Sequence, residues 1–353
     1  MKRNYWLDFL KLTFITIIAF WHTDWWTYLR YGFLPVEFFF IVSGYFVYSS
    51  YLKKKSFNKF VTDKIKRLFP TYLVILSVCA IYSLIFPKLY LNSSYEHWGL
   101  SLAREALLLQ SVGLDELFNV IKINLMRTTP TAWYVSVYFY GAVVLYGLLT
   151  YVPKRFINYT LSTIVIGVYG FYLLAWDGTM EIWTYKSIFY MPLWRGLADM
   201  SVGILLGMVL KNDYINKWSN THKGCFNTLC VIAILGATFS FVSPIDIEWL
   251  GIICFVYILA NAVNKNGIGS YFNKIEYAKY IPDISLEILL LHKILIPVSV
   301  KIAEILGVLY IDILKYIIYT TVIVGVSYIF NKYIIPQIKN TFSIIINRVI
   351  PTI

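Results

Sequence analysis

Apolar runs of about 20 residues recur along the whole chain, and they limit its possible folds more than any other feature. A run of this length crosses the hydrocarbon core of a bilayer as one helix. Because lipid cannot hydrogen-bond an exposed backbone, only helices and closed barrels span a membrane. We therefore expect an all-α polytopic membrane protein with about ten transmembrane helices, at roughly 5–26, 32–52, 70–90, 131–150, 159–176, 188–210, 226–243, 246–263, 284–308 and 311–335.

The composition agrees with this fold class. The 353 residues are 59% hydrophobic and 14% charged, far from the composition of a soluble globular domain. No segment is long and polar enough to fold by itself in water. We expect a single membrane-embedded domain over residues 1–353, with no separate soluble domain.

The net charge of +12 is explained by topology. With the N-terminus inside, most of the Lys and Arg fall in cytoplasmic segments, as the positive-inside rule requires, and both termini are then cytoplasmic. The densest basic block lies at 53–67. We therefore expect anionic lipid headgroups or an anionic substrate as partners, and no nucleic acid.

Ionisable residues inside the first run point to a function. Asp8, Lys11 and His22 share one helix face, because an offset of eleven residues returns to nearly the same side of a helix after a rise of roughly 16 Å. Such a stripe must face protein or water. Lys11 is either a structural ion-pair partner of Asp8 or a positive charge for an anionic group. The run lacks a small-residue cleavage site, and we expect it to be an uncleaved anchor.

His22 is the candidate general base. A neutral histidine beside a carboxylate is the commonest biological base, and both Glu37 and Asp24 are candidates for the acid. The first outer turn is short, so the first two helices should be antiparallel neighbours with His22 and Glu37 at similar depth. The alternative is an interfacial histidine beside the tryptophans, bonded to water.

Other intramembrane charges have two interpretations each. Arg195 and Asp199, at i and i+4, are either a self-satisfying pair or part of the site lining. His292 shares a helix face with Ser285, and it is either a structural residue or part of the site. Lys301, Glu304 and Lys315 are expected to be paired or close to loops, without a role in the site. We expect no metal site, since the chain shows no metal-ligand spacing.

Three further segments are informative. Ser43 and Gly44 predict a small-residue packing notch in the second helix. Lys64, Lys66 and Arg67 predict a basic cluster at the cytoplasmic mouth of the third span, with Pro70 starting its helix. In the outer excursion at about 91–130, the amphipathic stretch at 100–112 is expected to lie along the interface as a lid.

Taken in order, these elements resemble the acyltransferase-3 family of integral-membrane acyltransferases. That family opens with a leucine-aspartate pair, an arginine, ten intervening residues and a histidine. It continues with an acid before two or three phenylalanines and a serine-glycine pair. The matches are Leu7-Asp8, Lys11 and His22, then Val36-Glu37-Phe38-Phe39-Phe40 and Ser43-Gly44-Tyr45.

The later motifs match in order as well. They are Arg67, Pro70 and Tyr72, then Trp133 opening a central span, then Ser285 to His292 near the C-terminal end. Two positions depart from the family. Lys11 replaces the usual arginine and loses its bidentate fork. Tyr138 and Phe139 stand where some members carry an acidic pair, which leaves the acceptor class open.

The resemblance implies an O-acyltransferase in a bacterial cytoplasmic membrane. It would move an acyl group, most simply acetyl, from cytoplasmic acetyl-CoA or another acyl-CoA to a hydroxyl of a cell-surface or lipid-linked glycan. His22 and Glu37 would be catalytic. Lys11, Lys64, Lys66 and Arg67 would bind the donor, and substrate or structural support would come from Asp8, Ser43, Tyr72, Trp133, Arg195 and His292.

A transporter or flippase for a polar or lipid-linked substrate is the alternative, since a buried-charge stripe and many spans fit it too. The lack of an internal repeat and of spans broken by glycine and proline counts against it. The sequence leaves open the acceptor sugar, the acyl chain, the role of His22 as base or acyl carrier, the need for a partner protein and the oligomeric state.

Overall fold

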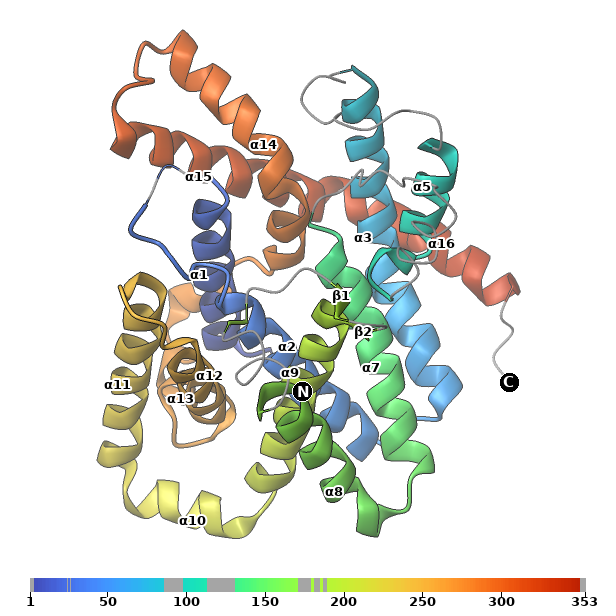
Figure 1. The fold of residues 1–353 in the computed structure, drawn as a ribbon, viewed down its shortest axis with the longest axis vertical. Helices are drawn as coiled ribbons and strands as arrows, with labels where there is room; N and C mark the ends of the chain where they lie inside the picture. Colours follow the sequence, from blue (N-terminus) through green and yellow to red (C-terminus); the bar gives the residue numbers. More distant parts are fainter. Residues whose placement is uncertain are drawn as a thin grey trace. The chain divides into compact units, whose positions relative to one another are not determined.

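The computed structural model describes residues 3–23, 25, 27–85, 98–112, 131–170, 179–180, 185–186 and 189–349. Over these residues the chain is built of helices, with one short antiparallel pair of strands (Figure 1). The chain divides into two compact units. Unit 1 comprises residues 1–54, 144–182 and 194–285, and unit 2 comprises 55–143, 183–193 and 286–353.

Unit 1 is a bundle around α1 (Tyr5–Trp21), α2 (Pro35–Leu52) and α12 (Glu248–Val263), which pack against one another. Its remaining elements are the second half of α7 (Trp133–Tyr151), α8 (Lys154–Val165), most of α9 (Met191–Leu210), α10 (Asp213–Thr221), α11 (Lys223–Val242), α13 (Ile268–Phe272) and η4 (Glu276–Tyr280). Aromatic rings fill its core, with Phe14 against Phe38 and Phe255 at centroid distances of 4.7 and 5.4 Å.

Unit 2 is organised by α3 (Phe57–Ile85), against which α5 (Trp98–Ala106) and α16 (Ile335–Val349) pack. Its other elements are η2 (Leu109–Ser111), the first half of α7 (Trp133–Tyr151), β1 (Tyr185–Lys186), β2 (Phe189–Tyr190), nearly all of α14 (Ser285–Ile305), α15 (Asp312–Ile329) and η5 (Phe330–Ile334).

Each of the ten apolar runs contains a helix, so the all-α fold class is confirmed. By length and apolar composition, five described helices are able to cross a membrane: Phe57–Ile85, Trp133–Tyr151, Met191–Leu210, Lys223–Val242 and Asp312–Ile344. The α1 helix has 17 residues, and α14 carries several charges. The count of ten spans and the side on which the termini lie stay predictions.

One expected boundary is wrong. Pro70 does not start a helix but lies inside α3, which begins at Phe57. Lys64, Lys66 and Arg67 are therefore helical and lie before the proline on the same helix. A proline is tolerated inside a helix of this kind because neighbouring segments satisfy the backbone groups that it frees.

The packing notch at Ser43-Gly44 is confirmed. A Cβ on Gly44 would lie 1.9 Å from the carbonyl oxygen of Met200, and a Cβ on Gly203 would lie 2.0 Å from that of Ile41. The backbones of α2 and α9 thus touch directly, which small residues alone permit.

At the C-terminal end of α1, Trp21 packs on Phe33, which precedes α2, at 5.6 Å; we call this part of unit 1 the His22 end. The turn between these helices is tied to the turn before α12: Tyr31 donates its N–H to the Phe241 carbonyl at 3.0 Å, and Arg30 donates to the Pro244 carbonyl at 3.1 Å. Glu248, in the first turn of α12, therefore reaches the same end of the bundle.

Candidate active site

Lys11 lies in a neutral ion cluster. Its ammonium contacts Asp8 at 2.8 Å and Asp283 at 2.9 Å, and Asp8 also pairs with Arg3 at 2.7 Å. The expected pair with Asp8, at i minus 3, is confirmed. Two cations and two carboxylates share the cluster, so the positive charge of Lys11 is balanced by the protein itself.

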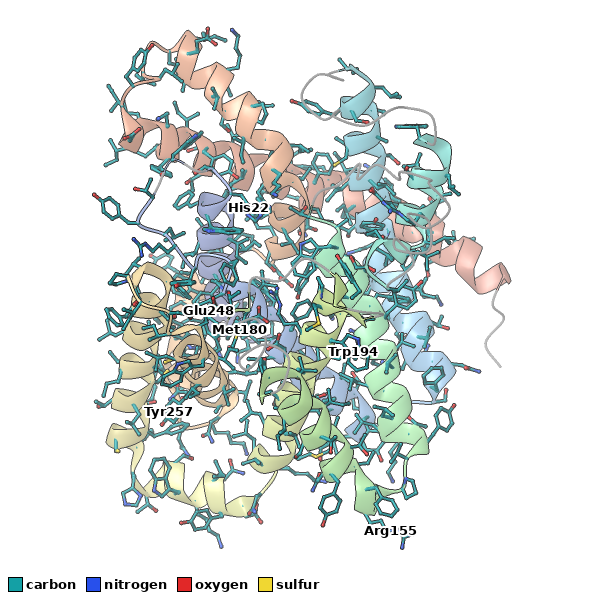
Figure 2. All side chains as sticks on the ribbon, viewed as in Figure 1. His22, Arg155, Met180, Trp194, Glu248 and Tyr257 are labelled. Atoms are coloured by element: carbon teal, nitrogen blue, oxygen red, sulfur yellow. The ribbon has the colours of Figure 1, made fainter. Side chains whose placement is uncertain are left out.

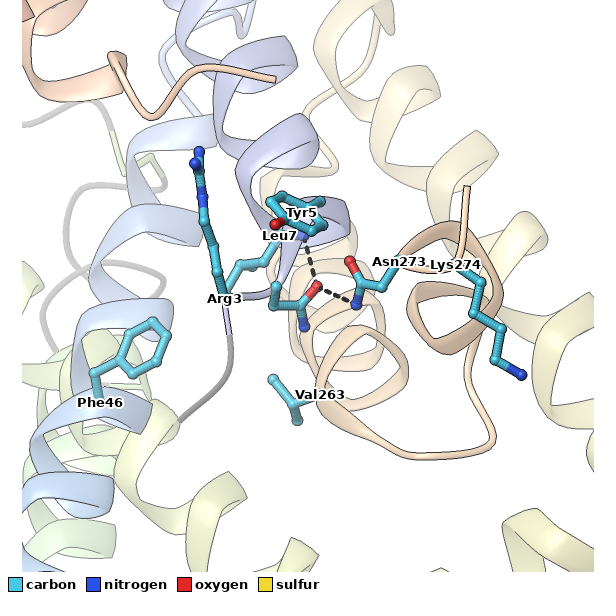
Figure 3. A pocket seen from close by; sticks show the side chains of 8 residues that line it. Arg3, Tyr5, Leu7, Phe46, Val263, Asn273 and Lys274 are labelled. Atoms are coloured by element: carbon cyan, nitrogen blue, oxygen red, sulfur yellow. Dashed lines mark hydrogen bonds between the residues drawn. The ribbon is translucent and has the colours of Figure 1, made fainter. Parts of the chain in front are cut away.

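A pocket of about 400 Å³ opens beside this cluster, at the start of α1 (Figure 3). Its wall is ordered by Asn4, which accepts from the Leu7 backbone and from Asn273 at 3.1 Å each, as the dashed lines show. Arg3 and Lys274 supply basic side chains, and Phe46 and Val263 supply apolar surface. The start of α1 thus combines an ordered ion cluster with an adjacent pocket.

Removing the Lys11 charge should destabilise unit 1. In Lys11→Met, the buried Asp8 keeps one cation in place of two, and we expect a thermal midpoint about 2–4 °C lower. Lys11→Arg should keep the midpoint. The control is Lys279→Met, because its pair with Glu276 is solvent-exposed and contributes little. A Lys11→Met protein with an unchanged midpoint but a raised KM for the donor would contradict the structural role.

His22 caps the C-terminal end of α1 and has a defined tautomer. Its Nδ1 lies 2.9 Å from the Ile18 carbonyl oxygen, and the ring packs edge-on against Trp21 at 4.7 Å. A carbonyl only accepts, so Nδ1 carries a proton, and in the neutral imidazole Nε2 then carries the lone pair. The half-buried ring is therefore oriented by its own helix and presents a basic nitrogen.

Glu37 lies in the first turn of α2, fully buried, and its ion-pair partner is Arg195, whose Nε is 3.1 Å from Oε1. Sequence reasoning paired Glu37 with His22; the contact that the structure gives His22 through Nδ1 goes to Ile18 instead. Asp24, the other candidate acid, lies outside the described residues. A catalytic role of Glu37 stays a prediction.

A network of buried charges surrounds Glu37. Asp199, also fully buried, interacts electrostatically with Glu37 and accepts a hydrogen bond from Tyr169. Arg195 donates to the carbonyl of Met180. Sequence reasoning found Arg195 and Asp199 by their spacing, but the partners from α2 and from residues 169 and 180 are distant in sequence and were not predicted.

Glu248 completes the network and was missed entirely. Its carboxylate accepts from the Thr179 hydroxyl and from the Met180 N–H, at 2.6 Å each (Figure 2). The one sequence signal for a buried acid was its position in the first turn of an apolar helix. That signal is weak, because any helix favours a carboxylate in its first turn. Burial, not motif, identifies this residue.

The basic candidates in unit 2 differ from one another. Lys64 is held by Tyr138, which lies 2.6 Å from its ammonium and also stacks its ring against it at 3.9 Å. Tyr138 is one of the residues that replace the acidic pair. Lys66 is half-buried and Arg67 is exposed. Arg67 is thus the most accessible charge of the cluster.

Tyr72 and Trp133 are buried beside the segment that was expected to be a lid. Tyr72 donates to the Glu105 carbonyl at 2.8 Å and accepts from Gln110 at 3.3 Å. Gln110 also donates to the Ala132 carbonyl, next to Trp133. The stretch at 100–112 therefore packs on α3 as α5 and η2; its role as a lid stays a prediction.

His292 and Ser43 have structural contacts. His292 is fully buried, with Nδ1 3.1 Å from the Ile288 carbonyl oxygen, and its own carbonyl accepts from Tyr319 at 3.0 Å. Ser43 donates to the Phe39 carbonyl at 2.6 Å. Lys301 and Lys315 form ion pairs at 2.8 and 2.7 Å, as expected. Among the described residues no cluster of His, Cys, Asp or Glu is arranged to hold a metal ion.

The chain matches a family model described as "Acyltransferase domain" over residues 4–332. The match runs from the cap of α1 into η5 and includes every candidate site residue. No curated protein and no solved structure matches the chain.

Proposed function

Because the chain belongs to the Acyltransferase 3 family and is a membrane acyltransferase, we propose that it moves an acyl group, most simply acetyl, from cytoplasmic acyl-CoA to a hydroxyl of a cell-surface or lipid-linked glycan. We place it in the cytoplasmic membrane of a bacterium. Family membership favours this enzyme over the transporter alternative.

The observation that carries the proposal is that His22, oriented through Nδ1, lies at the end of the same unbroken helix as Lys11. The α1 helix runs from Tyr5 to Trp21 without interruption, so Lys11 and His22 project from one rigid element, separated by roughly 16 Å of rise. This spacing suits a donor that enters at one end and an acceptor that enters at the other.

Two routes are consistent with the basic Nε2 of His22. As a general base, it takes the proton of the acceptor hydroxyl while the oxygen attacks the thioester carbonyl, and the CoA thiolate leaves and receives that proton. As an acyl carrier, it attacks the thioester first and then passes the acyl group to the hydroxyl. Both routes release CoA as a thiol and form an ester.

The donor's phosphates need cations at its entry. Arg67 is exposed, and Lys64 and Lys66 lie on the same helix. We assign to them the charge-assisted contacts with the donor. Lys11, within its neutral cluster, would fix the geometry of the start of α1.

Labelled acetyl-CoA and purified protein in lipid vesicles test the proposal. We expect CoA release that a polysaccharide or lipid-linked saccharide acceptor accelerates, with the label appearing on the acceptor as an alkali-labile ester. Mass spectrometry of surface glycans from cells with and without the protein identifies the acceptor. Acceptor uptake into vesicles without thioester consumption would instead support a transporter.

A further inference from the structure

We propose that Arg195 is a positioning residue of the acyltransferase site: its guanidinium joins the Glu37 carboxylate of α2 to the Met180 carbonyl and so fixes the His22 end of unit 1. The inference rests on the proposed function, since it gives Arg195 an effect on the reaction through Glu37. It gives a role to buried charged residues that take no part in the proposed chemistry of His22.

Burial makes Arg195 exceptional. It is the largest fully buried side chain in the described structure. A guanidinium without water is costly unless its charge is paired and its N–H groups donate. Two partners lie outside its own helix: the Glu37 carboxylate pairs with its charge at 3.1 Å, and Nη1 donates to the Met180 carbonyl. The side chain thus stabilises an arrangement of three separate segments.

Met180 is held from both sides. Arg195 of α9 donates to its carbonyl, and Glu248 of α12 accepts from its N–H at 2.6 Å. Glu248 also binds the Thr179 hydroxyl at 2.6 Å. Residues 179–180 are therefore bound by charged side chains of two helices; Figure 2 labels Met180 and Glu248 next to each other. We call Arg195, Glu37, Met180 and Glu248 the clamp.

The clamp acts close to His22 along the chain. Glu37 follows the segment that joins α1 to α2, and described residues of this segment contact both helix ends: Trp21 packs on Phe33 at 5.6 Å, and Leu34 donates to the Tyr31 carbonyl at 3.0 Å. A shift of Glu37 is therefore transmitted to the end of α1. Displacements of about 1 Å from a distant mutation cost on the order of 100-fold in rate.

Lysine is not equivalent at this position. Arg195 uses Nε toward Glu37 and Nη1 toward Met180, two directions that a planar guanidinium serves at once. An ammonium is a point donor on a flexible stem and does not reproduce that fork. Arg195→Lys should keep the positive charge but lose the simultaneous contacts with Glu37 and Met180.

Steady-state kinetics of acetyl transfer test the inference. For Arg195→Met we expect kcat to fall about 100-fold, with KM for the donor within about threefold. For Arg195→Lys, kcat should fall about tenfold. Arg155→Met is the matched control, because Arg155 is an exposed arginine of the same unit, and it should retain wild-type kinetics.

A double-mutant cycle decides whether Arg195 acts through Glu37. If it does, Arg195→Met combined with Glu37→Gln is no slower than the slower single variant, whereas independent roles multiply the losses. Rates are expressed per folded protein, taken from the monodisperse peak in detergent. Should Arg195→Met fail to fold, the cycle is run with Arg195→Lys.

Hydrogen exchange gives a readout that does not depend on activity. The peptide containing residues 179–180 should exchange at least about tenfold faster in Arg195→Lys than in wild type, and Arg155→Met should leave it unchanged. Unchanged exchange together with kcat within about threefold of wild type would overturn the inference. A wild-type protein without transferase activity but with the exchange difference would refute the proposed function and leave the clamp in place as a structural device.

Discussion

His22→Ala is expected to abolish acyl transfer while leaving the protein folded. General acid–base catalysis contributes about 10²–10⁴-fold, and loss of a nucleophile would cost at least as much. The ring is half-buried at the end of its helix, where it contacts the Ile18 carbonyl and Trp21, so the thermal midpoint should change little. Acetyl transfer per folded protein is the measurement.

His222→Ala is the matched control. His222 also caps a helix, with Nδ1 3.3 Å from the Trp218 carbonyl oxygen four residues earlier and its ring stacked on Trp218 at 5.5 Å. It shares with His22 the Nδ1 contact to the carbonyl four residues earlier, and it lies exposed. We expect full activity from this variant. Acyl transfer by His22→Ala would contradict both proposed roles of the His22 imidazole, general base and acyl carrier.

The two routes through His22 differ in one intermediate. An acyl carrier retains label from acetyl-CoA on the protein when no acceptor is present, and a general base does not. Rapid denaturation at neutral pH, followed by intact-mass measurement, separates them. His22→Ala sets the background.

Gly44→Val should prevent folding of unit 1. The added Cβ would lie 1.9 Å from the Met200 carbonyl oxygen, which is backbone and has no rotamer to change. Overpacking costs about 1–3 kcal/mol where side chains yield, and a backbone clash should exceed that range. We expect loss of the monodisperse peak in detergent.

Gly325→Ala provides the contrast. Gly325 lies in α15, and a Cβ there meets no atom within 4 Å. Alanine should be tolerated or stabilise the helix by up to about 1 kcal/mol. Normal yield from Gly44→Val would show that α2 and α9 do not approach each other as closely as the structure places them.

Local physics explains which features were predictable. The helices follow from apolar runs, the Asp8–Lys11 pair from a three-residue spacing, and the Gly44 notch from a small-residue step, all within one element. The start of α3 was predicted too late, because the basic residues before Pro70 looked like a loop. A helix that extends beyond the membrane carries charged residues there and still continues as a helix.

The contacts that organise the candidate site depend on the tertiary fold. Lys11 meets Asp283 across 272 positions, and Glu37 meets Arg195 from another helix. No periodicity encodes such pairings, since each partner also has a local alternative of the right charge. A pair with its near neighbour Asp199 was one of two interpretations for Arg195, and the structure gives it Glu37 and Met180 as partners. Sequence thus located Glu37, Arg195 and Asp199, but it missed Glu248 and the ion pair at the centre of the network.

The ion cluster of Arg3, Asp8, Lys11 and Asp283 has a kinetic consequence. Its charges cancel, so beyond a Debye length of about 8 Å in physiological salt it exerts almost no pull on a polyphosphate. Long-range steering of an anionic donor therefore falls to exposed cations such as Lys53, Lys54 and Arg67. Higher ionic strength should therefore slow encounter through those residues.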